Sequence, residues 1–227
     1  MAIETFNFSD TGAEHFAEIK AWLEANATDY FDSFELSEDK LTLTCKIGEK
    51  TAMTFARTSE RKSYCETFYN FDGTSSAQGT NTNIIYLDKI VKTSSGIAIR
   101  KNRGTTITNN YTFITKTNKG DTAFVFFDSA SSTWDVKSNV SNVFHFSAFT
   151  AEKTSFDVGG NLATATRQGV CRVADTTVLS PICLNESNGA YMPNCMVTVF
   201  GNVLNTECTL DHNGEKYFYN GYIALKE

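Results

Sequence analysis

Long hydrophobic runs are missing from this sequence, and their absence is the first limit on its function. No apolar stretch approaches the roughly 20 residues that a membrane-spanning helix needs, so we expect no membrane insertion. The N-terminus also has no basic segment followed by an apolar one. We therefore expect no secretory signal, and synthesis in the cytoplasm.

Compact metal-binding and phosphate-binding motifs are absent as well. The cysteines are Cys45, Cys65, Cys171, Cys183, Cys195 and Cys208. A zinc site would have to use Cys183, Cys195, Cys208 and His212, but these lack the closely spaced cysteine pair with which zinc sites usually begin. Free, buried thiols are the preferred interpretation in a reducing compartment. No glycine-rich phosphate loop occurs either.

Histidine is scarce, and the three present are His15, His145 and His212. No G-x-S-x-G motif accompanies them, although the members of a Ser–His–Asp triad can lie far apart in a sequence. We interpret His15 as a partly exposed helix residue and His212 as a polar residue at the tip of a hairpin.

Acidic residues gather at Asp29, Asp32, Glu35, Glu38 and Asp39. Glycoside hydrolysis uses a pair of carboxyl groups, and calcium binding uses several, but the EF-hand pattern is absent. A solvated acidic face is the preferred interpretation.

The basic residues at 100–104 are interpreted as a solvated turn, with contact to a phosphate or an acidic partner as the alternative. We predict no catalytic, cofactor or metal site, and no enzymatic activity.

Basic residues are fewer than acidic ones, 20 against 26, for a formal charge of 20 − 26 = −6. A nucleic-acid partner is therefore not expected, because such binders need Lys and Arg to neutralise phosphates. The net charge is −7 for residues 1–50, +5 for 51–127 and −4 for 128–227. Oppositely charged segments predict head-to-tail association of copies, with ordinary surface variation as the alternative.

The residues that are abundant favour β-structure. Phe, at 18, outnumbers Leu, at 11, and there are 30 threonines. Such side chains fit a pleated, half-buried surface. The predicted fold class is α+β and mostly β, with antiparallel hairpins and sheets and one N-terminal helix at about 13–26.

That helix is predicted from apolar residues spaced by three and four, at Phe16, Ile19, Trp22 and Leu23. The polar residues at 9–11 offer N-cap chemistry before it. Strand-like alternation at 34–36, 40–47 and 51–56 then predicts a short meander packed on the helix.

The polar stretch at 57–83, and above all 74–82, is predicted to be a flexible loop and a domain boundary. The predicted domains are 1–75, the helix plus meander, and 84–227, a β-rich domain ending in a hairpin.

A weak repeat follows at an offset of 24 residues. Residues 90–99 and 114–127 align Lys92, Thr93 and Gly96 with Lys116, Thr117 and Gly120, and each copy predicts a hairpin. Further strands are predicted at 143–149, with Phe144, Phe146 and Ala148 opposite His145, and at 196–204. The end of the chain predicts another hairpin, because Asn213-Gly214 joins two strand-like runs.

Tyrosines near the end of the chain suggest one binding surface. Tyr217 and Tyr219 would share a strand face, with Tyr222 close by, and exposed rings of this kind can stack on sugars. Cross-strand packing is the preferred interpretation.

Residues 179–185 (LSPICLN), 189–194 (GAYMPN) and 210–225 (LDHNGEKYFYNGYIAL), together with the two KTxxG hairpins, resemble the C-terminal region of structural proteins of tailed phages and prophages of Firmicutes. The resemblance covers about the last 140 residues, and its motifs are structural rather than catalytic. It implies a non-enzymatic virion component of the tail or baseplate region, which acts by self-assembly. The implied partners are further copies of the chain and other virion proteins. The alternative is a carbohydrate- or host-receptor-binding module of the same kind of particle, with a host-surface glycan as partner.

Overall fold

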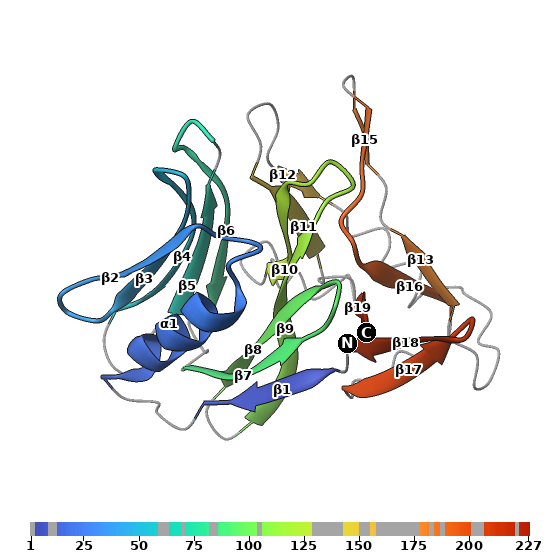
Figure 1. The fold of residues 1–227 in the computed structure, drawn as a ribbon, viewed down its shortest axis with the longest axis horizontal. Helices are drawn as coiled ribbons and strands as arrows, with labels where there is room; N and C mark the ends of the chain where they lie inside the picture. The colour runs from blue at the N-terminus through green and yellow to red at the C-terminus, as the bar shows by residue number, and fades with distance from the viewer. Residues whose placement is uncertain are drawn as a thin grey trace, which may run out of the picture.

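The computed structural model describes most of the chain: residues 3–8, 13–58, 64–69, 71–81, 86–103, 106–128, 143–149, 155–157, 178–181, 184–186, 189–200, 207–220 and 223–227. One helix and four β-sheets, one of them a two-stranded hairpin, make up this part (Figure 1). The predicted fold class, α+β and mostly β with a single N-terminal helix, is confirmed. In the described part no helix is long and apolar enough to cross a membrane.

The central sheet has seven antiparallel strands in the order β1-β7-β8-β9-β10-β11-β12. Their bounds are β1 (Glu4–Asn7), β7 (Tyr86–Lys92), β8 (Gly96–Arg103), β9 (Thr106–Lys116), β10 (Thr122–Asp128), β11 (Val143–Ala148) and β12 (Ser155–Asp157). Both hairpins of the repeat belong to this sheet, as β7–β8 and β9–β10. The side chains of β11 on which the predicted alternation rests lie outside the described residues.

The N-terminal sheet is a five-stranded meander in sequence order. Its strands are β2 (Ser33–Leu36), β3 (Thr42–Ile47), β4 (Lys50–Arg57), β5 (Tyr64–Tyr69) and β6 (Ser75–Asn81). Three threonines, Thr44, Thr54 and Thr67, lie directly opposite one another on β3, β4 and β5 and are partly exposed. Rows of this kind on the outer face account for part of the high threonine content.

The prediction of a flexible loop over 74–82 is wrong, because most of it forms β6. The β6 sequence, SSAQGTN, has almost no apolar residue, and pairing with β5 holds it in place through the backbone. The division into domains 1–75 and 84–227 stays a prediction. β1 from the N-terminal segment pairs with β7 in the central sheet.

The C-terminal sheet has the strand order β13-β16-β19-β18-β17. Its bounds are β13 (Val178–Pro181), β16 (Met196–Phe200), β17 (Cys208–His212), β18 (Glu215–Tyr219) and β19 (Ile223–Lys226), and a separate small hairpin joins β14 (Leu184–Glu186) to β15 (Gly189–Tyr191). The predicted Asn213-Gly214 turn joins β17 to β18. Both residues have positive φ, 54° and 79°, as a two-residue type I′ turn requires.

The helix α1 (His15–Asn26) buries His15, Phe16, Ile19 and Leu23. Its N-cap position is Glu14, which makes no capping hydrogen bond through its side chain. The residues predicted to cap the helix, 9–11, lie outside the described residues. Trp22 is only partly buried and packs at the border of the core.

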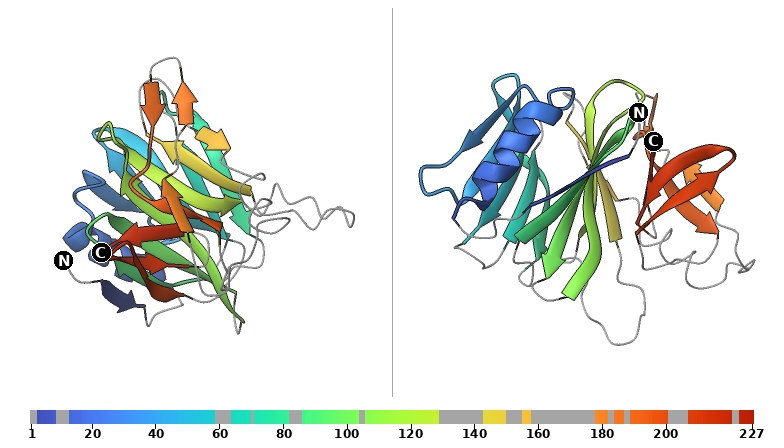
Figure 2. Two further views of the ribbon diagram at one scale, coloured as in Figure 1. Left: turned by 90° about the vertical axis from the view of Figure 1, so that its right-hand side faces the viewer. Right: turned by 60° about the horizontal axis from the view of Figure 1, so that its bottom comes forward.

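Both faces of the central sheet are covered (Figures 1 and 2). On β10, Phe124 and Phe126 face α1 and the N-terminal sheet, whereas Ala123 and Val125 face the C-terminal sheet. Because both faces of the strands of the repeat hairpins are buried, their sequences are nearly continuous apolar runs and do not alternate between apolar and polar residues. The molecule is thus layered, with a core on each side of the central sheet.

Candidate functional site

The two aligned turns of the repeat share a hydroxyl-centred geometry. Thr93 Oγ1 accepts a hydrogen bond from the backbone N–H of Ser95 at 3.2 Å, and Thr117 Oγ1 accepts one from Lys119 at 3.1 Å. A hydroxyl that bonds the backbone two residues further on stabilises a turn.

The aligned glycines are needed for different reasons. Gly120 has φ +89°, which side chains rarely adopt. Gly96 lies so close to β9 that a Cβ atom there would be 2.6 Å from the carbonyl oxygen of Ile114.

Each turn docks a segment from the C-terminal part of the chain. At the first turn, Ser95 Oγ donates to the carbonyl oxygen of Lys226 at 2.9 Å. At the second turn, Asn118 N donates to Met192 O and Asn118 Oδ1 accepts from Met192 N, both at 2.9 Å. The N–H of Asn194 donates to Lys116 O at 2.8 Å. The repeat and the C-terminal motifs therefore contact one another directly, and they join the C-terminal part to the central sheet.

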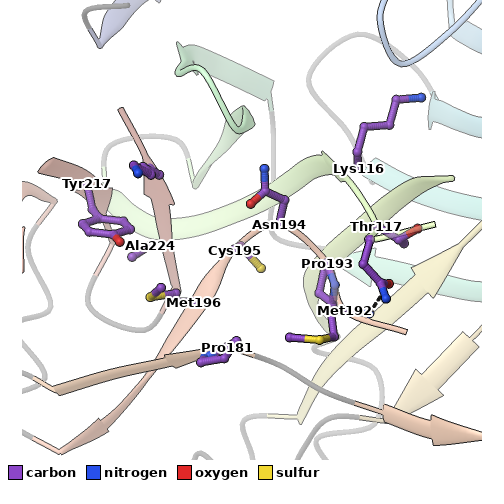
Figure 3. A pocket seen from close by; sticks show the side chains of 12 residues that line it. Lys116, Thr117, Pro181, Met192, Pro193, Asn194, Cys195, Met196, Tyr217 and Ala224 are labelled. Atoms are coloured by element: carbon purple, nitrogen blue, oxygen red, sulfur yellow. Dashed lines mark hydrogen bonds between the residues drawn. The ribbon is translucent and has the colours of Figure 1, made fainter. Parts of the chain in front are cut away.

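A pocket of about 390 Å³ lies at the second of these joints (Figure 3). It is lined by Lys116, Thr117, Asn118, Pro181, Met192, Pro193, Asn194, Cys195, Met196, Tyr217, Ala224 and Lys226. Pro193 and Cys195 are buried, whereas the amides of Asn118 and Asn194 belong to exposed residues. The pocket is large enough for a small ligand.

The chemistry of this pocket favours contact over catalysis. None of the described residues that line it is Asp, Glu or His. Burial raises the pKa of the Cys195 thiol to about 12, so the thiol stays protonated and is a poor nucleophile. Burial also lowers the pKa of the Lys116 ammonium, against the opposing effect of Asp121, and its Nζ donates to Thr122 Oγ1 at 3.2 Å.

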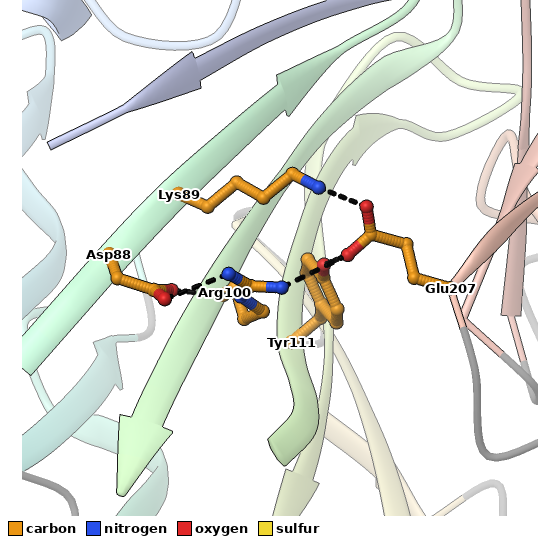
Figure 4. A network of polar contacts seen from close by, with 5 residues as sticks. All are labelled: Asp88, Lys89, Arg100, Tyr111 and Glu207. Atoms are coloured by element: carbon orange, nitrogen blue, oxygen red, sulfur yellow. Dashed lines mark hydrogen bonds and ion pairs between the residues drawn. The ribbon is translucent and has the colours of Figure 1, made fainter. Parts of the chain in front are cut away.

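A second polar assembly, the Glu207 network, consists of Asp88, Lys89, Arg100, Tyr111 and Glu207 (Figure 4). Arg100 donates to both carboxylate oxygens of Asp88, at 2.9 and 2.8 Å. Glu207 accepts from Lys89 and Tyr111 and, at 3.3 Å, from Arg100. Because Glu207 immediately precedes β17, its carboxylate joins the C-terminal sheet to three strands of the central sheet.

Charge states in this network follow from its contacts. Burial alone would raise the pKa of the Glu207 carboxyl, but the hydrogen bonds from Lys89 and Tyr111 hold that pKa below its ordinary value of 4.5. Burial and the bond to Glu207 raise the pKa of the Tyr111 hydroxyl, which keeps it a donor. Hydrogen bonds to Asp88 raise the pKa of the Arg100 guanidinium.

We expect Glu207→Gln to lower the free energy of unfolding by about 1–3 kcal/mol at pH 7, because charge-assisted hydrogen bonds are lost. Since the folded-state pKa of Glu207 is depressed, its contribution is present above pH 4.5 and disappears as the pH falls through the lower folded value. The difference between wild type and variant should therefore shrink on acidification, as measured by urea unfolding at several pH values. The control is Glu215→Gln, in the exposed pair with Lys226. A loss that stays the same down to pH 3 would contradict this role.

A fully buried ion pair links the other two layers. Lys101 on β8 pairs with Glu66 on β5, with side chains 4% and 0% exposed. Tyr64 donates to Glu66 Oε1 at 2.8 Å, and Thr112 donates to Oε2 at 2.7 Å. Burial raises the pKa of the Tyr64 hydroxyl, with a smaller effect from Glu66. The cluster is enclosed in the core, because all four of its side chains are almost fully buried.

The expectation that His15 is partly exposed is wrong. Its side chain is fully buried, and Nε2 accepts a hydrogen bond from the N–H of Leu87 at 3.1 Å. His212 ends β17 beside the predicted hairpin turn, where its ring Nε2 lies 3.2 Å from the side-chain Nδ2 of Asn213. The side chain of His145 lies outside the described residues.

The described residues include only some of the candidate zinc ligands. Cys195 is buried, Cys208 is half-buried, and Cys183 and Cys171 lie outside the described residues. The four described cysteines are free thiols. Among the described residues, no group of three His, Cys, Asp or Glu side chains is placed to hold a metal.

The predicted acidic cluster stabilises turns and neighbouring strands. Asp32 accepts from the N–H of Gly48 at 2.6 Å, and Glu35 pairs with Lys46 across β2 and β3. Hydrogen bonds from Ser37 and from the backbone of Leu41 lower the pKa of the Asp39 carboxyl. These carboxylates are thus engaged with groups near them in the fold.

The structure corrects the interpretation of the basic stretch and goes against the sugar-stacking alternative for the C-terminal tyrosines. The basic stretch at 100–104 is not a solvated turn, because β8 extends to Arg103 and both Arg100 and Lys101 enter ion pairs. Tyr217 and Tyr219 do not offer rings for sugar stacking, because they are 5% and 1% exposed and pack with Leu179 and Ala224. Tyr222 lies outside the described residues.

Comparison of the chain with protein-family models, with curated proteins and with solved structures finds no match.

Proposed function

We propose that this chain is a non-enzymatic structural component of a tailed-phage or prophage particle, in the tail or baseplate region. It acts by association with further copies of itself and with other virion proteins. The basis for the viral assignment is the resemblance of the C-terminal motifs and the KTxxG hairpins to structural proteins of such particles.

One structural observation supports a scaffolding role for those motifs. Segments that carry the resemblance bond to one another, Asn118 with Met192 and Lys116 with Asn194. Ser95 of the first hairpin also bonds to Lys226, the residue after the last motif. These segments are used to join layers of the fold, and burial of Tyr217 and Tyr219 removes the ring surface that a sugar would need.

The test is to locate the protein in its source cell. Particles from an induced culture are purified on a density gradient, and the fractions are probed with an antibody against the chain. We expect the protein to sediment with the particles at several copies each, and immunogold to label the tail end. A protein found only in the soluble fractions of a particle-producing culture would contradict the proposal.

A further inference from the structure

β1 forms one outer edge of the central sheet. It pairs with β7 on one side, and in the described structure no strand pairs with its other side. All four of its residues are exposed. Figures 1 and 2 show the strand, in dark blue, at the border of the molecule.

The direction of its backbone groups follows from one hydrogen bond and the register. Phe8 N donates to Asp88 O at 2.9 Å, and Phe6 and Glu4 lie opposite Ile90 and Lys92. In an antiparallel pair, alternate residues direct both N–H and C=O toward the partner strand. Thr5 and Asn7 therefore direct their N–H and C=O groups to the open side, where a further strand can bind them.

An exposed aromatic side chain lies beside this open edge. Phe6 is 37% exposed, with Phe8 at 5.0 Å and Trp22 at 6.2 Å between ring centroids. The other large exposed side chain in the described structure, Phe71, is 41% exposed and is covered on one face by the Lys50 ammonium, 3.8 Å from its centroid. β1 contains no Pro or Lys, the residues that often protect an edge from pairing.

We propose that β1 pairs antiparallel with β1 of a second copy about a two-fold axis, with Phe6 opposite Phe6 of the second copy. In this register Thr5 faces Asn7 of the other copy, and the outward N–H and C=O groups of these residues form the hydrogen bonds. Phe6 falls at a non-hydrogen-bonded position, where opposing side chains are closest. The strand is thus complementary to itself, and the two central sheets become continuous.

Electrostatics permit this pairing. Glu4, the single charged residue of β1, lies opposite Phe8 of the second copy and not opposite the second Glu4, and Lys92 lies next to it within its own chain.

The inference rests on the proposed function, in which copies of this chain associate. A four-residue strand with one aromatic pair is a small contact, so its affinity gains most where many copies are held together.

The test is a cysteine cross-link. Opposing residues at a non-hydrogen-bonded position have Cα atoms about 4.5 Å apart, within the range that a disulfide spans. We expect Phe6→Cys to give a disulfide-linked dimer on a non-reducing gel after mild oxidation. Wild type and Phe71→Cys, the matched exposed control, should give little disulfide-linked dimer on the same gel. Cross-linking of Phe6→Cys no stronger than that of Phe71→Cys would overturn the proposal.

A second variant separates strand pairing from chance collision. Thr5→Pro removes an outward N–H and leaves the hydrogen bonds to β7 intact, so the melting temperature should be unchanged. Introduced beside Phe6→Cys, it should reduce the dimer yield at least fivefold, and an unchanged yield would overturn strand pairing. A chain that sediments with particles but fails the cross-link test refutes this interface alone. A chain that forms the dimer but is absent from particles refutes the proposed function alone.

Discussion

Glu66→Gln is expected to lower the free energy of unfolding by about 3–5 kcal/mol, because it leaves a buried ammonium without its carboxylate. The Lys101 and Glu66 side chains are 4% and 0% exposed, so water does not replace the lost partner. Tyr64 and Thr112 now donate to different carboxylate oxygens, and since Gln keeps only one oxygen, one of these two donors also loses its acceptor. Urea unfolding at pH 7, followed by intrinsic fluorescence, measures the change.

The matched control is Glu35→Gln, which removes the carboxylate of an exposed pair with Lys46, 60% exposed at Glu35. Pairs of this kind contribute about 0–1 kcal/mol. Replacing both buried partners by apolar residues, Glu66→Leu with Lys101→Met, should restore much of the lost stability, because no charge is then buried. A loss below 1 kcal/mol for Glu66→Gln would mean that the pair is open to solvent.

Phe68→Ala is expected to cost about 3–5 kcal/mol, the range for removal of a buried aromatic ring. Phe68 is fully buried on β5 and lies over the central sheet, with ring centroids 4.2 Å from Phe126 and 4.9 Å from Phe124. The substitution would leave a cavity between the N-terminal and central sheets, and the sheets can relax only partly to fill it. Thermal and urea unfolding give the magnitude.

Phe71→Ala is the control for Phe68→Ala, since it removes an exposed ring from the loop that follows the same strand. We expect a change of about 0.5 kcal/mol or less. The Phe68 variant also tests the domain prediction. A shared core predicts one cooperative transition that shifts as a whole, whereas independent domains at 1–75 and 84–227 would give two transitions, with only the first shifted.

The charge pattern of the sequence acquires a different meaning in the fold. The excess of basic residues at 51–127 suggested a surface for neighbouring copies. Lys89, Arg100 and Lys101, however, pair with Glu207, Asp88 and Glu66 inside the chain. Head-to-tail association by charge stays a prediction, and these three cations are already neutralised at the joints between layers.

Local sequence patterns by themselves determined the helix, the hairpins and the Asn213-Gly214 turn. The apolar spacing at Phe16, Ile19 and Leu23 predicts a helix that the structure begins at His15 and ends at Asn26. The turn needs positive φ at two adjacent residues, and Asn-Gly is the pair that adopts it most easily. These elements depend on interactions between residues a few positions apart, so the order of residues is enough to predict them.

Tertiary structure alone decided which polar residues are buried. β6 forms because β5 provides a row of backbone partners, and nothing in its own apolar content indicates a strand. Glu66 occupies an inward position between Tyr64 and Phe68, and Lys101 continues the inward series of Ile97 and Ile99. A charged residue at an inward position of a strand indicates that it has a buried partner of opposite charge. Here, however, the two partners are 35 residues apart in the sequence and belong to different sheets. His15 follows the same rule, because burial is set by the layer that packs against a strand or helix, and that layer comes from a distant part of the chain.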